Sequence, residues 1–288
     1  MIELSYFLYG FTYVLSGLAM LYVAKTAFDF ATPYKLNVQL TERDNPAIGV
    51  VLSGFLLGII SVLVGSFFGE GEGEIGFDGY LTDMGPTAFY GLIGIILLLV
   101  AGVINDKCIL RNFSNNTEIL EKQNVSVGVV IGAGYIGSGL IIAGGLQGSE
   151  DILSVPLAFI FGQLALVIFA VVYQKATAYD DQNELSTQQN LACGIAFGGN
   201  ILAYSILLMK GLSMGDGELI ELKDRLFHFL YYAVSGAVAL PVLRLINDKL
   251  FLPNASLTDE IVKDKNTNAS LIEATLAIAI SILLIINL

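Results

Sequence analysis

The sequence has little of what soluble enzymes use for catalysis. It contains one histidine, two cysteines and no tryptophan, and only 14% of its 288 residues are charged. A single histidine, His228, excludes histidine-based metal clusters and triads with a histidine base. Cys108 and Cys193 have neither disulfide nor metal-ligand spacing, so we interpret them as packing residues. We therefore expect no enzymatic activity, no cofactor and no metal site.

Positive charge is also scarce. Lysine and arginine number 14 against 26 aspartates and glutamates, a net charge of −12. No basic stripe is present to follow phosphates, so nucleic acid is excluded as a partner. Much of the acidity lies in one Gly-rich segment that forms either a cation-attracting vestibule or, as we favour, a solvated loop. Its acidic residues are Glu70, Glu72, Glu74, Asp78 and Asp83.

Apolar residues are abundant and occur in long runs. They make up 55% of the chain, and stretches of about 18–24 residues are long enough to cross a bilayer as helices. The sequence predicts an all-α membrane protein with eight transmembrane helices in contact with the lipid bilayer. The expected spans are 6–28, 46–68, 87–105, 125–146, 154–174, 191–212, 227–246 and 269–287.

The distribution of lysine and arginine predicts the orientation. Loops after odd-numbered spans carry eleven of these residues, and the opposite side carries only Lys210, Lys223 and Arg225. Because basic loops remain in the cytoplasm, we expect both termini to be extracytoplasmic. The start Met1–Ser5 has no basic region of a signal peptide, so the first span is expected to be retained.

A short pattern recurs four times along the chain. An asparagine begins an apolar stretch, and small residues follow 2, 9 and 13 positions later. We interpret the asparagine as a helix N-cap and the small residues as one close-packing helix face. Convergence of the four helix N-termini on an anion is the alternative. The asparagines are Asn45, Asn124, Asn190 and Asn268, and the paired small residues are Gly54 and Gly58, Ala133 and Gly137, Gly199 and Ala203, and Ala277 and Ser281.

The two halves of the chain repeat each other. The block Ala31–Tyr34 recurs as Ala176–Tyr179, and the block Ile104–Leu110 recurs as 246–252. Since each half has an even number of spans, the halves form parallel repeats with a pseudo-two-fold axis along the membrane normal. The expected units are a first repeat 1–146 with hairpins 6–68 and 87–146, an extracytoplasmic connector 147–153, and a second repeat 154–288 with hairpins 154–212 and 227–287.

These features resemble the YjfL-type bacterial inner-membrane family, known as domain of unknown function 350. The matching helix starts are 44–49, 123–128, 189–194 and 264–270, although the last has Ile272 where the others have glycine. The resemblance implies a bacterial inner-membrane location, a tandem form of the family repeat, and an association with envelope-stress and polyamine-related systems. It implies no assigned activity.

One repeat unit differs in charge. Five positions after the asparagine the units carry Val50, Val129 and Ile195, but the last carries Glu273. Gly102 likewise corresponds to Arg244 in the second half. Charges inside spans usually pair or line a wet cavity. Arg244 and Glu273 therefore form a charge pair or face a cavity, unless Arg244 extends to the headgroups and Glu273 is a first-turn acid.

Two functions remain open from the sequence. The first is a small channel or transporter for cations or other small solutes, with a polar path near Arg244 and Glu273. The alternative is a non-transporting scaffold that docks a cytoplasmic protein partner in an envelope-stress or polyamine-related system. Flat small-residue faces also allow a homo-oligomer.

Overall fold

The computed structural model describes residues 4–67, 77–147, 153–213, 222–251, 253 and 255–287. Eight long α-helices make up most of it, and no strand occurs within those ranges. All eight are long and apolar enough to cross a membrane. They are α1 (Leu4–Ala31), α2 (Pro46–Phe67), α3 (Phe77–Ile104), α4 (Val125–Gln147), α5 (Ser154–Ala176), α7 (Leu191–Leu212), α8 (Leu222–Phe251) and α10 (Thr267–Asn287).

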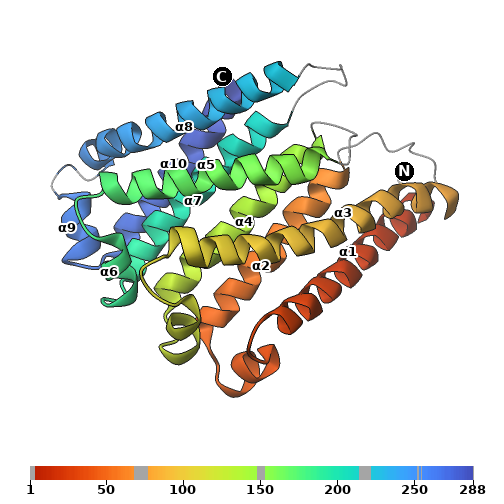
Figure 1. The fold of residues 1–288 in the computed structure, drawn as a ribbon, viewed down its shortest axis with the longest axis horizontal. Coiled ribbons are helices and arrows are strands. Elements are labelled where there is room, and N and C mark those ends of the chain that lie inside the picture. The colour runs from red at the N-terminus through yellow and green to blue at the C-terminus, as the bar shows by residue number, and fades with distance from the viewer. Residues whose placement is uncertain are drawn as a thin grey trace.

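Short helices lie at one end of the bundle, which we call the turn end. Three are π-helical and two are α-helical: η1 (Val38–Glu42), η2 (Asn105–Ile109), η3 (Thr117–Glu121), α6 (Asp181–Ser186) and α9 (Leu257–Val262). Both chain termini lie at the opposite, terminal end (Figure 1). Each hairpin therefore enters the turn end, passes through one short helix, or through η2 and η3 in the second hairpin, and returns.

The long helices form two layers (Figure 1). The helices α2, α4, α7 and α10 pack side by side in a row, and α1, α3, α5 and α8 cross over them. The middle helices α4 and α7 are the most enclosed, with 78% of an 18-residue window buried, against 11% for α1. The core therefore lies along the row.

Glycines allow the backbones of the row to touch. A Cβ added at Gly54 of α2 would lie 2.3 Å from the Cα of Gly132 of α4. The same addition at Gly199 of α7 would lie 2.3 Å from the Cβ of Ala274 of α10. Apolar side chains gain little by leaving lipid for protein, so close backbone approach is the source of helix association here.

The predicted fold class is confirmed: the protein is all-helical in its described residues, with eight candidate spans in two repeats. Three helices are clearly longer than expected: α1 extends from Leu4 to Ala31, α3 begins at Phe77, and α8 extends from Leu222 to Phe251. The structure adds that the four units follow one another in an open row. Most of the predicted connector 147–153, and Glu70, Glu72 and Glu74 of the acidic segment, lie outside the described residues.

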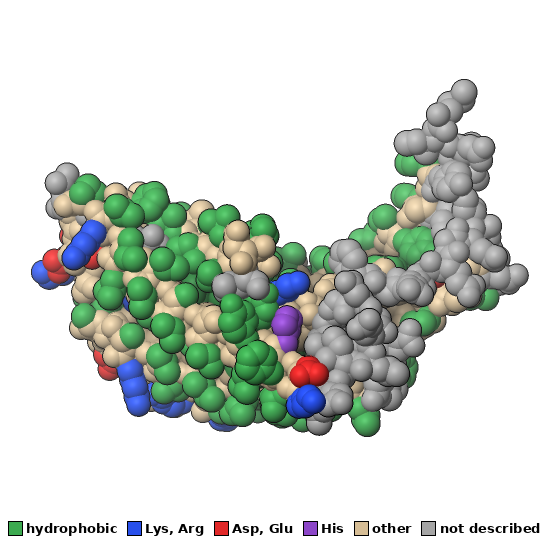
Figure 2. Space-filling view, turned by 90° about the horizontal axis from the view of Figure 1, so that it is seen from above, with side chains coloured by type: hydrophobic (Ala, Val, Ile, Leu, Met, Phe, Trp, Pro, Cys, Tyr) green, Lys and Arg blue, Asp and Glu red, His purple; other side chains and the backbone are tan. Residues whose placement is uncertain are grey.

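Hydrophobic side chains also cover much of the outer surface. Figure 2, seen from above relative to Figure 1, shows them spread over the described part of the surface in that view. Phe30, Val103, Leu164 and Ile286 are each more than half exposed. Such a surface is stable only in contact with lipid or another apolar surface.

Candidate functional site

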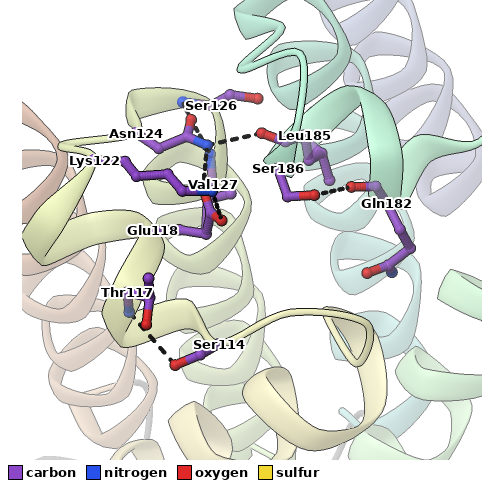
Figure 3. A network of polar contacts seen from close by, with 10 residues as sticks. All are labelled: Ser114, Thr117, Glu118, Lys122, Asn124, Ser126, Val127, Gln182, Leu185 and Ser186. Atoms are coloured by element: carbon purple, nitrogen blue, oxygen red, sulfur yellow. Dashed lines mark hydrogen bonds and ion pairs between the residues drawn. The ribbon is translucent and has the colours of Figure 1, made fainter.

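The cap asparagines form the junctions between units. In Asn124, Oδ1 accepts hydrogen bonds from the backbone N–H of Ser126 (3.1 Å) and Val127 (3.4 Å). Its Nδ2 donates to Oε2 of Glu118 in the same unit and to the carbonyl of Leu185 in the next unit, at 2.9 and 2.8 Å (Figure 3). One side chain thus caps its helix and binds two short helices.

The same connection occurs at the neighbouring junctions. Nδ2 of Asn45 donates to the carbonyl of Ile119, and Nδ2 of Asn190 to that of Ile261, each at 2.8 Å. All three asparagines are at most 2% exposed. Because these bonds replace water at buried backbone groups, the asparagines hold neighbouring units in register.

The fourth cap is Asn266, so the prediction of Asn268 was wrong. Oδ1 of Asn266 accepts from the N–H of Asn268 at 3.0 Å, and its Nδ2 donates to Glu260 Oε2 at 2.7 Å. The residue before each cap has a positive φ, and Lys265 (φ 48°) matches Asp44, Gln123 and Gln189. The predicted cap was two positions too late because Asn266 and Asn268 both precede small residues.

The corrected register changes the small-residue stripe of α10. When Asn266 is aligned with Asn124, Ala277 and Ser281 correspond to Tyr135 and Gly139. In α4 these positions face back toward α2, where a Cβ at Gly139 would lie 2.3 Å from the Gly58 oxygen. Ala277 and Ser281 are accordingly buried on the side that faces the preceding unit.

The face of α10 that would meet a following unit is uncovered. Its positions 9 and 13 after the cap hold Thr275 and Ala279, both exposed. In the preceding helices the equivalent residues are small and buried against the next helix. They are Gly54 and Gly58, Ala133 and Gly137, and Gly199 and Ala203. The row of described helices therefore ends at α10.

Replacing Asn266 by alanine is expected to destabilise the protein by about 1 kcal/mol, the usual value of an N-cap. Replacing the exposed Asn268 should change stability by less than about 0.5 kcal/mol. Chemical denaturation in detergent measures both values. A larger loss for Asn268→Ala than for Asn266→Ala would contradict the corrected register.

Register also determines the neighbours of Glu273. Counted from Asn266, it occupies position 7, where the other units have Leu52, Ile131 and Phe197, all buried. The predicted alignment with Val50, Val129 and Ile195 is therefore wrong. Glu273 is 4% exposed, so its carboxylate lies in the protein interior.

Arg244 and Glu273 contact each other directly. Nε of Arg244 lies 2.8 Å from Oε1 of Glu273, with side-chain exposures of 14% and 4%. Nδ2 of Asn200 donates to the same Oε1 at 3.2 Å, and Nη2 of Arg244 donates to the Tyr179 hydroxyl at 3.3 Å. The guanidinium carbon also lies 5.2 Å from the centre of the Tyr173 ring, a cation–π geometry.

Two atoms at this pair have unused hydrogen-bonding capacity. Oε2 of Glu273 and the hydroxyl of Tyr173 are buried, and neither forms a hydrogen bond of ordinary geometry among the described residues. The hydroxyl nevertheless lies near the Glu273 carboxylate. Burial of such atoms costs free energy unless they are satisfied. The Arg244–Glu273 ion pair therefore leaves two buried polar atoms, Glu273 Oε2 and the Tyr173 hydroxyl, unsatisfied among the described residues.

The equivalent region of the first half is apolar. The sequences of the two halves align when Asn45 is paired with Asn190 and Asn124 with Asn266. In this alignment Tyr173, Asn200, Arg244, Glu273 and Ala277 replace Phe28, Phe55, Gly102, Ile131 and Tyr135. Phe28, Phe55 and Tyr135 pack their rings 4.7 to 6.1 Å apart. One fold position thus holds aromatic rings in one half and charges in the other.

Steric exclusion links two of these differences. A Cβ at Gly102 would lie 2.3 Å from the Tyr135 hydroxyl, so a side chain at this position clashes with Tyr135. In the second half the tyrosine is replaced by Ala277, and the space is available to Arg244. The exchange of both residues together is what admits the guanidinium.

Asp181 adds a second carboxyl, which sequence reasoning missed. It is 2% exposed and corresponds to Leu36 of the first half. Thr177 donates its hydroxyl to Oδ2, and Cys193 Sγ lies 3.8 Å from Oδ1. Burial raises the pKa of Asp181 from 3.8 to about 7, although Thr177 and Arg244 act in the opposite direction. Aligning the two halves position by position would have revealed it.

We call Tyr173, Asp181, Asn200, Arg244 and Glu273 the charged cluster. Two large pockets at the turn end reach it, and a third of only about 10 Å³ lies beside Glu273. A polar pocket of about 450 Å³ is lined by Arg111, Asn112, Gln174, Lys175, Thr177, Ala178, Tyr179, Asp180, Asp181 and Gln182. An arginine pocket of about 240 Å³ includes Tyr173, Arg244 and Asp248. Both contain Thr177 and Ala178, so the Tyr179–Arg244 hydrogen bond lies between them.

The part of the chain that the structure describes contains no group of three His, Cys, Asp or Glu side chains suited to a metal ion. The charged cluster combines two carboxyls with one guanidinium. This composition can bind a proton or exchange ion-pair partners within a low-dielectric interior.

The fold and its junctions define a helical membrane protein built from tandem units. The model of the family described as Domain of Unknown Function (DUF350) matches residues 1–146 and again 149–286. The chain therefore belongs to this family, in a form with two copies of its domain.

Curated relatives agree with this assignment. The chain is 23% identical over 263 residues to a UPF0719 transmembrane protein of Aquifex aeolicus, covering 89% of this chain and 91% of the relative. It is 27% identical over 131 residues to the UPF0719 inner membrane protein YjfL of Escherichia coli, covering 45% of this chain and 89% of that protein. The latter is thus similar to one half of this chain. No solved structure matches.

Proposed function

We propose that this protein is a small channel or transporter for cations in the bacterial inner membrane, with the charged cluster as its binding site. The observation that carries the proposal is the difference between the halves. The same fold position is filled by stable aromatic packing in the first half, so the fold does not need charges there. Buried ionisable residues in membrane proteins are costly and commonly mark ion pathways.

The turn end is proposed to face the cytoplasm and both termini the outside. The excess of lysine and arginine in the loops at the turn end supports this orientation. The polar and arginine pockets would then be filled from the cytoplasmic side. The E. coli relative is named an inner membrane protein, which supports the same membrane for this chain. We propose no enzymatic role.

A scaffold without transport is the second candidate. An apolar pocket of about 270 Å³ at the terminal end, which includes Phe161, Arg225 and Phe229, shares no lining residue with the two turn-end pockets. A protein that binds a cytoplasmic partner through its turn end needs no path between the two ends. This separation is the observation in favour of the scaffold.

Cation flux through purified protein in liposomes tests the two candidates. Wild-type protein is expected to increase potassium or sodium flux over empty liposomes, and Glu273→Gln should reduce it at least about tenfold, since it removes the charge of a buried ionic site. Asp259→Asn, an exposed carboxylate in α9, is the control and should transport like wild type. Absence of flux with folded, reconstituted wild-type protein would overturn the transport proposal.

A further inference from the structure

The carboxyl of Asp181 occupies a place where the first half has a leucine. It comes from α6 and helps to line the polar pocket. Among the described residues its side-chain partners are the Thr177 hydroxyl and the Cys193 thiol, neither of which carries a positive charge. A buried carboxylate without a direct cation is unfavourable, whereas the protonated form is not.

Charged and titratable groups surround Asp181 from every neighbouring element. Cys193 of α7 touches it, and Glu184 lies on α6 itself. Arg244 of α8 acts on it electrostatically, and Asp181 in turn acts on Tyr173 of α5. Further groups are Tyr179 of the preceding turn, Glu273 and Asp248 beyond Arg244, and Arg111, Lys175 and Asp180 around the polar pocket.

Arg244 is the cation that acts on both Asp181 and Glu273. It now binds Glu273 and the hydroxyl of Tyr179, which lies two residues before Asp181. An ionised Asp181 attracts the guanidinium toward the turn end, and a protonated Asp181 leaves it with Glu273. Tyr179 lies on the boundary between the two pockets, so a shift of Arg244 changes the contact that separates them.

We propose that Asp181 is a proton-binding site, reached from the turn end through the polar pocket, whose charge state is coupled to the Arg244–Glu273 ion pair. The proposal depends on the proposed function in one respect only: if the protein transports cations, that transport is linked to protons. Proton binding itself is independent of transport and can be measured without it.

The direct test is thermal unfolding in detergent between about pH 5 and pH 8. The pKa of Asp181 is about 7 in the folded state against an ordinary value of 3.8, so folding favours the protonated group. The stabilisation is complete below the unfolded pKa and is lost as pH rises through about 7. Asp181→Asn cannot ionise, so near pH 8 it should unfold roughly 5 °C above wild type, with the difference narrowing toward pH 5.

The matched control is Asp259→Asn in α9, an exposed carboxylate that lines neither the polar pocket nor the arginine pocket. This variant should follow the wild-type pH profile. Asp181→Leu, which introduces the residue of the first half, provides a second non-ionising variant if Asp181→Asn folds poorly.

The coupling between Asp181 and the ion pair is tested by measuring the pH profile of unfolding in the double variant Arg244→Met/Glu273→Leu. Because Arg244 lowers the pKa of Asp181, its removal should move the pH profile of unfolding upward. Identical profiles for wild type and both Asp181 variants would overturn proton binding, and an unmoved profile in the double background would overturn the coupling. Absent flux with an intact pH profile would refute only the proposed transport function.

Discussion

Replacing Gly139 by leucine is expected to prevent assembly of the helix row, whereas the same change at Gly49 should be tolerated. Gly139 of α4 faces the backbone of Gly58 in α2, and a Cβ alone would lie 2.3 Å from its oxygen. Gly49 of α2 has nothing within 4 Å of its Cβ position. Both variants replace a glycine by leucine, so they differ only in how close the backbone of the neighbouring helix lies.

The expected loss for Gly139→Leu is at least about 3 kcal/mol, because overpacking against side chains that can move already costs about 1–3 kcal/mol and here the obstacle is backbone. The measurement is the monodisperse fraction in size-exclusion chromatography after solubilisation, together with the unfolding temperature. Wild-type behaviour of Gly139→Leu would show that the α2–α4 contact is not close-packed as described.

Breaking the Arg244–Glu273 pair from one side is expected to be the second large effect. Either Arg244→Met or Glu273→Leu should cost about 3–5 kcal/mol, because the remaining charge is left buried without its partner. The double variant should recover most of this loss, since apolar residues can replace a buried pair at little cost. Denaturant unfolding of the four proteins provides the double-mutant cycle.

The Lys263–Asp259 pair of α9 serves as the control for this cycle. Its atoms are 2.7 Å apart, almost the distance of the buried pair, but its side chains are 73% and 51% exposed. Truncation of an exposed pair changes stability by about 1 kcal/mol or less. Additive losses at Arg244 and Glu273 would contradict a direct interaction.

Much of the fold could be predicted from the sequence. Runs of apolar residues longer than a bilayer core leave few structures other than helices, and the blocks that recur between 31–34 and 176–179 reveal the two halves. Arg244 and Glu273 could be identified because a charge within an apolar span is conspicuous. Tyr173 and Asn200 escaped notice because such residues are ordinary within spans.

The register of the last unit was not predictable by spacing alone. Asn266 and Asn268 both precede small residues, and small residues occur on both faces of these helices. Only the hydrogen bonds of Asn266, and the positive φ of Lys265 before it, separate the two. In the corrected alignment Glu273 corresponds to the buried residues Leu52, Ile131 and Phe197, and no longer to Val50 and its equivalents.

By itself, the sequence determined that this protein is helical, spans a membrane, and consists of two repeats of one family domain. Those properties depend on composition and local periodicity, which are carried by each segment alone. The tertiary structure decided that the units form an open row ending at α10, and that Arg244, Glu273 and Asp181 share one site. Contacts between helices depend on which faces approach each other, and that is determined by backbone proximity between residues far apart in the chain.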